Sequence, residues 1–579
     1  MNKAQVAAIL DEIGTLLELQ GENSFRTNTY HNGARVVEQL EEDLDDLVAQ
    51  KKLGQVRGIG SSLEQKIVTL VTTGSLPYYD ELKKKTPEGL LQMLRVQGLG
   101  PKKVKALYDN LKIDDLDKLK AACDAGEVAE LKGFGAKTQQ KILEGIAFLT
   151  EVGDRIRIDQ AWAMAAGLLD GLRDAPGVVR MEVCGSLRRR RETIRDIDIL
   201  ISAADAGPIM DRFVGLPGVK SVTGKGDTKS SVFVTDGKHT MNADLRVVTD
   251  EQFAYALHHF TGSKEHNIHM RARAQERGLK MNEYELAGAD SRVVCKTEAD
   301  IFRALGLDYI PPEMREDTGE IDAAEKHTLP NLVEVGDVQG VFHNHTTYSD
   351  GAATVEQMAR AAKALGLKYL GFGDHSQSLT VANGLTPERV RQAQDEIDAV
   401  GKTLKGIRLF KGTEVDILAD GSLDYDDDLL ATFDYVVASV HTHFNLSRDE
   451  MTKRIIRAVR HPRVTMLGHA TGRLLLKREG YDVDLEAVLQ AAAESGTMIE
   501  INAHPVRLDL DWIHCKRAKA LGVKLVINPD AHSCEELALY RYGIDVARRG
   551  WLSKDDVFNT HSPAEVAKVF ARGKKAAHG

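Results

Sequence analysis

The chain has 579 residues, which at roughly 100 to 200 residues per domain predicts about three to five domains. Its composition, 42% hydrophobic and 28% charged, is typical of folded globular protein and excludes a disordered or fibrous chain. With 86 acidic and 76 basic residues the net charge is −10, so any binding to nucleic acid must depend on local basic patches.

The sequence also lacks the marks of export and of membrane insertion. No apolar stretch approaches the roughly 20 residues that a membrane helix needs, and Asp11, Glu12 and Glu18 lie where a signal peptide would be apolar. The five cysteines are scattered and form no C-x-x-C pair, which argues against a disulfide framework and a thiolate zinc site. We therefore expect a cytoplasmic protein that does not bind a membrane.

Helical periodicity interrupted by glycine pairs characterises residues 1–152. An apolar residue flanked by two glycines occurs three times, in VRGIGSSLEQKI, VQGLGPKKVKAL and LKGFGAKTQQKI. Each copy ends one predicted helix and opens the next, which exposes backbone N–H groups to an anion such as phosphate. The alternative for any one copy is a tight helical corner. The pattern resembles the helix-hairpin-helix motif, which grips a DNA backbone without reading bases. The DNA-binding residues implied are Gly58, Gly60, Gly98, Gly100, Lys102, Gly133 and Gly135.

Two aspartates mark the next region, where strand-like and helical segments alternate. In CGSLRRRRETIRDIDIL, Asp196 and Asp198 are two apart on a predicted strand and therefore point to one face, roughly 6.6 to 7 Å apart. Asp244 lies in the strand-like MNADLRVV. If the two strands are neighbours, three carboxylates converge on two Mg²⁺ ions, the arrangement of nucleotidyl transfer. Alone, D-x-D is more typical of a solvated strand edge.

A phosphate cradle is predicted just upstream. Gly185 allows close backbone approach, Ser186 offers a hydroxyl, and Arg189 can fork onto phosphate oxygens. Together with Glu192, the Asp-Ile-Asp motif, Asp244 and the segment HHFTGSKEHNIHMRARAQERGLKMNEYEL, this pattern resembles family X DNA polymerases over residues 1–320.

The resemblance assigns roles by position. It implies Mg²⁺ or Mn²⁺ on Asp196, Asp198 and Asp244, with Asp244 accepting the primer 3′-hydroxyl proton. Ser186 and Arg189 would hold the β- and γ-phosphates. The other contacts implied are Phe260 and Gly262 at the sugar, Asn267 and Arg271 at the minor groove, Tyr284 supporting that groove, and Lys66 as the lysine of an abasic-site lyase.

This sequence departs from the vertebrate repair pattern at several positions. These positions are Arg195, Asn242, His259 and Lys264. Base stacking and sugar discrimination are therefore the properties that are carried over least safely from the family to this chain. For Lys66 a Schiff base requires a neutral amine, and the alternative is a lysine that contacts phosphate or solvent.

A change of pattern follows the acidic segment EDTGEIDAAEKHTLPNLVEVGDVQG, which we interpret as a linker. Short apolar strands then alternate with helices, which predicts parallel β/α units. Seven predicted strands end in His, Asp or Glu, as a β/α barrel with its site at the C-terminal face requires. Imidazole and carboxylate ligands together favour a multinuclear site for Mn²⁺, Zn²⁺ or Fe²⁺ that hydrolyses phosphoesters. His443, His504 and His514 are interpreted as core or capping residues.

The motifs HNHTTYSDG, GDHS, GHATGR and NPDAH resemble the polymerase and histidinol phosphatase (PHP) family. The metal ligands that this implies are His343, His345, Asp350, His375, Glu414, His441, His469, Asp530 and His532. A family X polymerase fused to a PHP domain is typical of bacteria, where the PHP domain is associated with 3′-to-5′ exonuclease activity and abasic-site processing.

We thus expect a multidomain fold: an all-α helix-hairpin-helix N-terminal region, an α/β nucleotidyltransferase palm with a thumb, and a distorted (β/α)7 PHP barrel. The expected boundaries are 1–80 (lyase-like helical domain), 81–152 (helical fingers), 153–250 (palm), 251–318 (thumb), 319–337 (linker) and 338–579 (PHP domain). The expected function is gap-filling DNA synthesis in repair with 3′-to-5′ exonuclease activity, by a monomer that binds gapped or primer-template DNA and dNTPs. The alternatives are a phosphatase tethered to DNA and a non-enzymatic DNA-binding scaffold.

Overall fold

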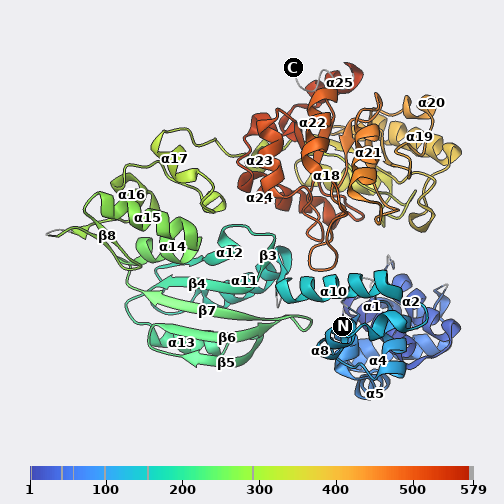
Figure 1. The fold of residues 1–579 in the computed structure, drawn as a ribbon, viewed down its shortest axis with the longest axis horizontal. Coiled ribbons are helices and arrows are strands. Elements are labelled where there is room, and N and C mark those ends of the chain that lie inside the picture. Colours follow the sequence, from blue (N-terminus) through green and yellow to red (C-terminus); the bar gives the residue numbers. More distant parts are fainter. Residues whose placement is uncertain are drawn as a thin grey trace. The chain divides into compact units, whose positions relative to one another are not determined.

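The computed structural model describes residues 1, 3–38, 40, 44–56, 58–94, 96, 99–152, 155–289 and 292–572. Its chain divides into two compact units, Met1–Gly153 and Asp154–Gly579, each described by itself (Figure 1). Gly98, one of the predicted DNA-binding glycines, lies outside the described residues. Across the described ranges, no helix is both long and apolar enough to cross a membrane.

The first unit is helical, as the glycine-punctuated pattern predicts. The apolar residue of each glycine pair is buried, because Ile59, Leu99 and Phe134 fill the corner between helices. Its helices are α1 (Lys3–Gln20), α2 (Ser24–Glu38), α3 (Leu44–Ala49), α4 (Ser61–Thr73), α5 (Pro77–Lys85), α6 (Glu88–Met93), α7 (Pro101–Leu111), α8 (Leu116–Asp124), α9 (Glu127–Glu130) and α10 (Gly135–Val152).

A five-stranded mixed sheet forms the expected palm, with strand order β2-β4-β7-β6-β5 (Figure 1). Strands β4 and β7 run parallel, whereas the other neighbours are antiparallel. The strands of this sheet are β2 (Arg180–Val183), β4 (Asp196–Ser202), β5 (Val219–Lys225), β6 (Lys229–Thr235) and β7 (Thr240–Val248). A separate two-stranded sheet consists of β1 (Ile156–Arg157) and β3 (Thr193–Ile194), and the helices are α11 (Ile158–Arg173), α12 (Gly185–Arg188) and α13 (Gly207–Val214).

The expected thumb has a separate core of buried apolar residues that includes Tyr255, Met270 and Phe302. Its elements are α14 (Phe253–Thr261), α15 (Lys264–Glu276), β8 (Lys280–Met281), β9 (Leu286–Ala287), β10 (Arg292–Val293) and α16 (Glu298–Ala304).

The segment 319–337 is ordered, so the prediction of a free linker is wrong. It contains helix α17 (Glu320–Glu325), and Ile321 and Ala324 are buried in the core of the thumb. Val333 donates its N–H to the carbonyl of Leu552 at 2.9 Å, which fastens the segment to the C-terminal domain. Acidic composition and a proline suggested a linker, but these distant contacts order the backbone.

The C-terminal domain contains parallel strands joined by helices, as the alternating pattern predicts. The strands are β11 (Gly340–Val341), β12 (Tyr369–Gly371), β13 (Arg408–Phe410), β14 (Gly412–Asp416), β15 (Tyr435–Ser439), β16 (Met466–Leu467), β17 (Met498–Asn502) and β18 (Leu525–Asn528). The helices are α18 (Val355–Ala364), α19 (Pro387–Thr403), α20 (Asp427–Leu430), α21 (Arg448–Val459), α22 (Leu485–Ser495), α23 (Trp512–Ala520), α24 (Tyr540–Arg549) and α25 (Pro563–Arg572).

These strands form two parallel sheets, β11-β12-β13 and β14-β15-β16-β17-β18. Single parallel bridges connect the sheets, between Asn344 and Ala531 and between His375 and Glu414. A regular barrel would have continuous hydrogen bonding between all neighbouring strands, whereas single bridges join these two sheets. The predicted seven-stranded barrel therefore stays a prediction.

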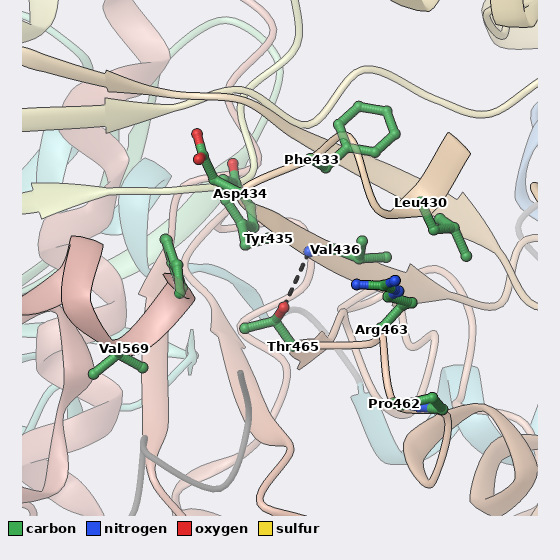
Figure 2. Close-up of a pocket in the computed structure, with 10 residues that line it drawn as sticks. Leu430, Phe433, Asp434, Tyr435, Val436, Pro462, Arg463, Thr465 and Val569 are labelled. Carbon is green, nitrogen blue, oxygen red and sulfur yellow. Dashed lines mark hydrogen bonds between the residues drawn. The ribbon is translucent and has the colours of Figure 1, made fainter. Parts of the chain in front are cut away.

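Aromatic rings fill the end of these sheets that is opposite the metal-ligand residues. Phe570 of α25 lies 5.5 Å from the ring centroid of Phe342 and 5.4 Å from those of Phe410 and Tyr435. Figure 2 shows a neighbouring pocket that is lined by Tyr435 and by Val569 of α25. The last described helix therefore closes this end of the domain with its apolar face.

Candidate active sites

The palm sheet brings the three predicted aspartates onto neighbouring strands. Strand β4 pairs with β7 in a register that places Asp198 opposite Asp244 and Asp196 opposite Asn242. Residues two apart on a strand share a face, so Asp196 and Asp198 point the same way. The conditional prediction that these strands are neighbours is thus confirmed.

Electrostatics at this edge of the sheet differ between the carboxylates. Burial, together with the charges of Asp196 and Asp244, raises the pKa of Asp198 to about 7. Burial alone would raise the pKa of Asp244 too, but Lys229 and Asn242 outweigh it and hold that pKa below its usual value. Lys229 Nζ lies 2.7 Å from Asp244 Oδ2, and Asn242 Nδ2 donates to Asp244 Oδ1 at 3.1 Å.

These residues fit a hard divalent cation, because three carboxylates supply the oxygen ligands that Mg²⁺ and Mn²⁺ prefer. A raised carboxyl pKa beside two other acids is the expected sign of an uncompensated negative site. The carboxylate oxygens of the three palm aspartates do not meet the distance that defines the groups of possible metal ligands in the C-terminal domain. Within each of those groups the ligand atoms lie within 4.8 Å of one another. Lys229, which sequence reasoning missed, holds one oxygen of Asp244.

Gly185 begins the short helix α12 and lies against the aspartates. Its φ is +60°, and a Cβ at this position would be 2.3 Å from Asp198 Oδ2. Only glycine allows the backbone to approach that carboxylate so closely, whereas its predicted approach to phosphate stays a prediction. Ser186 follows in the first turn of α12 and is partly exposed.

Arg189 bonds within the protein in this structure, and its predicted contact with phosphate stays a prediction. Its side chain is buried, with Nε donating to Glu316 Oε1 at 3.1 Å and Nη1 donating to the carbonyl of Thr261 at 2.6 Å. The guanidinium therefore joins the palm to the thumb. Glu316 lies far away in the sequence, so no local pattern could have indicated this pair.

The predicted sugar and groove residues lie on the two thumb helices next to the palm and on the loop between them. Phe260 packs under the guanidinium of Arg246, whose carbon lies 4.4 Å from the ring centroid. Asn267 donates to the carbonyl of His259 at 2.7 Å, so one of its N–H groups faces its own chain. Of the remaining predicted residues, Gly262 has φ +67°, Arg271 is partly exposed on α15, and Tyr284 is exposed in the turn before β9.

The helix-hairpin-helix residues lie at helix starts in the first unit. Gly60 and Gly100 are the N-caps of α4 and α7, Gly135 begins α10, and Gly58 and Gly133 have positive φ. Lys102 is exposed in the first turn of α7. This placement leaves the helix N-termini free for the predicted phosphate contacts.

Lys66 lies on α4 between two tyrosines. Its Nζ is 5.4 Å from the ring centroid of Tyr78 and 5.9 Å from that of Tyr30, and it donates to Ser62 Oγ at 2.9 Å. Partial burial and the charge of Arg26 lower the pKa of Lys66. The direction suits a nucleophilic amine.

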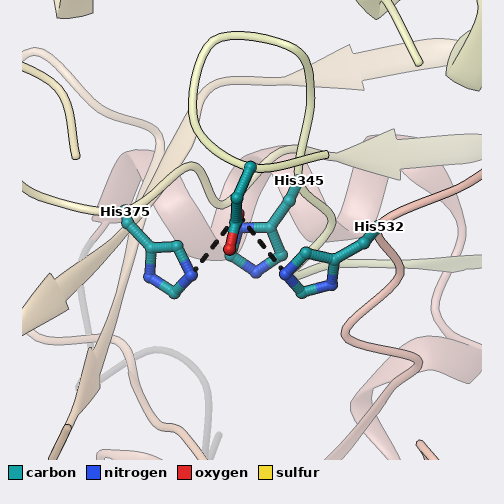
Figure 3. Close-up of side chains that lie close together, drawn as sticks. His345, His375 and His532 are labelled. Carbon is teal, nitrogen blue, oxygen red and sulfur yellow. Dashed lines mark ion pairs between the residues drawn. The ribbon is translucent and has the colours of Figure 1, made fainter. Parts of the chain in front are cut away.

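All nine predicted ligands of the C-terminal domain gather at the carboxyl ends of its strands. Three groups have ligand atoms within 4.8 Å of one another: His345, Asp350, His375 and His532; His343, His345 and Asp530; His375, Glu414 and His441. The ninth residue, His469, has its Nε2 2.9 Å from Glu414 Oε1. Figure 3 shows His345, His375 and His532 converging from separate strands. Three overlapping groups fit the predicted multinuclear site.

Unpartnered buried atoms support a metal here. His343 Nε2, His345 Nδ1, His375 Nδ1 and Glu414 Oε2 are buried without a well-aligned hydrogen bond, although His375 Nδ1 lies 2.8 Å from Glu414 Oε2. Buried polar atoms normally have a partner, and a metal ion would supply one. Burial, with neighbouring His532 and His375, lowers the pKa of His345 to about 3, so its imidazole is neutral, the form that binds metals.

Backbone strain marks the same residues. His343, His469 and Asp530 adopt positive φ values of 54°, 21° and 53°. Such conformations cost a non-glycine residue about 1 to 3 kcal/mol and are typical of functional sites. Packing of the surrounding strands therefore holds these side chains in place for a purpose other than stability.

A second set of acids, which sequence reasoning missed, orients the histidines. Glu500 Oε1 lies 2.6 Å from His343 Nδ1, and Asp416 Oδ1 lies 2.5 Å from His441 Nδ1. Histidines that bind metals commonly donate their other ring N–H to a carboxylate in this way. Glu500 lies inside β17 and Asp416 ends β14, and neither position alone distinguishes a residue that orients a histidine from a ligand or an ordinary polar residue.

One arginine and three further histidines belong to the same domain as the metal-ligand residues. Arg507 Nε lies 3.5 Å from Asp530 Oδ2, and its side chain is partly exposed at the site. His504 Nε2 lies 3.8 Å from Glu536, and His514 pairs with the N-cap Asp511 at 2.6 Å. His443 is exposed. His514 therefore contacts the N-cap residue of α23 and is not itself the cap, so its predicted capping role is not confirmed, and Arg507 was not predicted.

Comparison with known proteins agrees with both sites. Residues 1–76 match a helix-hairpin-helix domain, 90–147 a SAM-like helix-hairpin-helix tandem, 256–316 the DNA polymerase beta thumb and 342–504 the PHP domain. The DNA polymerase/3′-5′ exonuclease PolX of Bacillus subtilis (strain 168) is 38% identical over 574 residues, which covers 99% of this chain and 100% of that protein.

The C-terminal domain has separate relatives. A probable phosphatase of Thermoanaerobacter sp. (strain X514) is 29% identical over 229 residues, 38% of this chain and 89% of that protein. A probable phosphatase of Aliivibrio fischeri (strain MJ11) is 30% identical over 217 residues, 35% of this chain and 81% of that protein. Because similarity to PolX extends over nearly the whole chain, the protein belongs to the bacterial family X DNA polymerases that carry a C-terminal PHP domain.

Proposed function

We propose that this protein fills short gaps in DNA and trims DNA 3′ ends with its PHP domain. The observation that supports the proposal is that the parallel pair β4–β7 of the palm carries three carboxylates, and that the PHP domain separately gathers acidic and imidazole groups at the ends of its strands. The name of the B. subtilis relative combines the same two activities.

Synthesis would use Asp196, Asp198 and Asp244 to hold Mg²⁺ or Mn²⁺, which neutralises the triphosphate and favours ionisation of the attacking hydroxyl. Asp244 would accept the 3′-hydroxyl proton; its depressed pKa keeps it ionised, and also makes it a weak base that depends on a bound cation to acidify the hydroxyl. Ser186 and the backbone at Gly185 would contact the phosphates. Asp198, with a pKa of about 7, must lose its proton before a cation can bind.

Exonuclease action would use the nine-residue PHP site. Bound Mn²⁺, Zn²⁺ or Fe²⁺ would lower the pKa of water enough to supply hydroxide near neutral pH. Glu500 and Asp416 orient His343 and His441 for this purpose, and Arg507 offers a cation to the phosphate of a DNA 3′ end.

Substitutions in one site should leave the other activity intact, which tests the proposal. Asp244→Ala should abolish extension of a labelled gapped duplex by dNTPs with Mn²⁺, and His343→Ala should abolish shortening when dNTPs are withheld. Each variant serves as the control for the other, because the two sites share no residue. Extension by Asp196→Ala/Asp198→Ala near the wild-type rate would refute the polymerase assignment.

The rival of a DNA-tethered phosphatase has one observation in its favour, since the PHP domain alone matches probable phosphatases. A small phosphomonoester hydrolysed faster than a DNA 3′ end, with no extension of gapped DNA, would favour that rival. Monomeric state, cytoplasmic location and abasic-site processing stay predictions.

A further inference from the structure

Helix α24 of the PHP domain reaches the loop that follows the phosphate cradle of the palm. Arg549 donates from Nη1 to the carbonyl oxygen of Arg189 at 2.7 Å, and the same atom lies 3.1 Å from Glu316 Oε1. The Arg549 side chain is buried, and its guanidinium carbon lies 5.1 Å from the ring centroid of Trp512. A buried PHP cation therefore holds polymerase backbone three residues beyond Ser186.

The contact continues into the thumb. Glu316 Oε1 accepts from both Arg549 Nη1 and Arg189 Nε, each at 3.1 Å. Arg189 in turn donates to the carbonyl of Thr261 at 2.6 Å, and its own N–H bonds to the carbonyl of Gly185. One network thus joins the PHP domain, the end of the thumb and both ends of α12.

Helix α12 needs such support because it has only four residues, Gly185–Arg188. A single helical turn is not stable alone, since nucleation fixes several dihedral angles for one hydrogen bond. Its position therefore depends on what holds its ends. Arg549 holds the C-terminal end through a backbone carbonyl, whose hydrogen bond to a charged donor is stronger than one to a neutral donor.

The neighbouring arginine makes a natural comparison. Arg548 also leaves α24 toward the polymerase, but it pairs with Glu313 at 2.8 Å and donates to the carbonyl of Val333. Neither partner belongs to the phosphate loop. Arg548 and Arg549 therefore share one helix and one interface, and of these two residues Arg549 is the one with a hydrogen bond in the structure to Arg189, the C-cap of α12.

We propose that Arg549 is a positioning residue for nucleotide addition: the PHP domain, through this side chain, holds the loop that binds the dNTP phosphates. The proposal rests on the proposed polymerase function. It predicts that the PHP domain serves synthesis through its docking helix as well as excision through its metal site, and that these two roles are separable by substitution.

The test compares full-length Arg549→Leu and Arg548→Leu in single-nucleotide gap filling. Arg549→Leu should raise KM for dNTP about tenfold with a much smaller change in kcat, the sign of lost ground-state positioning. Arg548→Leu should leave KM unchanged. Metal content and the 3′-to-5′ exonuclease rate should equal wild type in both variants, because neither residue belongs to the metal site.

Further variants keep the test decisive. Arg549→Lys should give an intermediate KM, and this variant replaces Arg549→Leu if the latter does not fold. Glu316→Gln should also raise KM, and the double variant should be no worse than the worse single one, because both residues act through one network. A wild-type KM in Arg549→Leu with normal exonuclease activity, or an equal rise in Arg548→Leu, would overturn the inference. A wild-type protein that fills no gap would instead refute the proposed function.

Discussion

Replacement of Gly185 by alanine should separate the two activities through a single methyl group. The new Cβ would lie 2.3 Å from Asp198 Oδ2, whereas an ordinary contact needs roughly 3.5 Å, so loop or carboxylate must move by about 1 Å. The φ of +60° adds about 1 to 2 kcal/mol of strain, because alanine disfavours the left-handed region.

Displacement of about 1 Å at reacting groups commonly costs about 100-fold in rate, so Gly185→Ala should fill gaps about 100-fold more slowly. The assay is single-nucleotide extension of a gapped duplex, with exonuclease activity measured on the same preparation and expected to equal wild type. Gly167→Ala is the matched control, because this glycine lies within α11 with no atom near its Cβ position. Gap filling by Gly185→Ala at the wild-type rate would refute the argument that the cradle touches Asp198.

Three other predictions concern single groups. Glu500→Gln should lower the metal affinity of the PHP site about 10- to 100-fold, measured as metal content after dialysis, because His343 loses its charged partner; unchanged content would contradict this. Mn²⁺ binding at the polymerase site should weaken about fivefold between pH 7 and pH 6, since below its pKa of about 7 Asp198 binds a proton that the cation must displace; equal dissociation constants by electron paramagnetic resonance would exclude it. Borohydride should trap wild-type protein on an incised abasic duplex, and Lys66→Ala should not be trapped; equal trapping would move the lyase amine elsewhere.

Residues with a local signal were predictable from the sequence. Most PHP ligands follow a short apolar strand, and parallel strands place their carboxyl ends together, so His345 and Asp530 could be assigned to one site without a structure. Asp196 and Asp198 were predictable from the two-residue period of a strand, although their proximity to Asp244 required the β4–β7 pairing to be known.

Residues whose role comes from a distant partner were not predictable. Arg189 has the sequence context of a phosphate ligand, but Glu316 and Thr261 occupy its donors. Glu500 looks like any polar residue in a strand until His343 is placed beside it. The segment 319–337 has the composition of a linker, but the burial of Ile321 and Ala324 and the contact with Leu552 order it. Such pairings depend on tertiary structure, which local periodicity does not encode.

The closing helix α25 decides how the nuclease can be removed experimentally. Phe570 completes an aromatic cluster with Phe342, Phe410 and Tyr435, which lie on strands that also lead to metal ligands. A chain shortened before Pro563 would expose that cluster to water and lose the packing under the metal site. The exonuclease activity should therefore be removed by substituting the metal ligands. In a truncated enzyme, loss of the aromatic core would change other properties as well, so its activity could not be compared with that of the wild type.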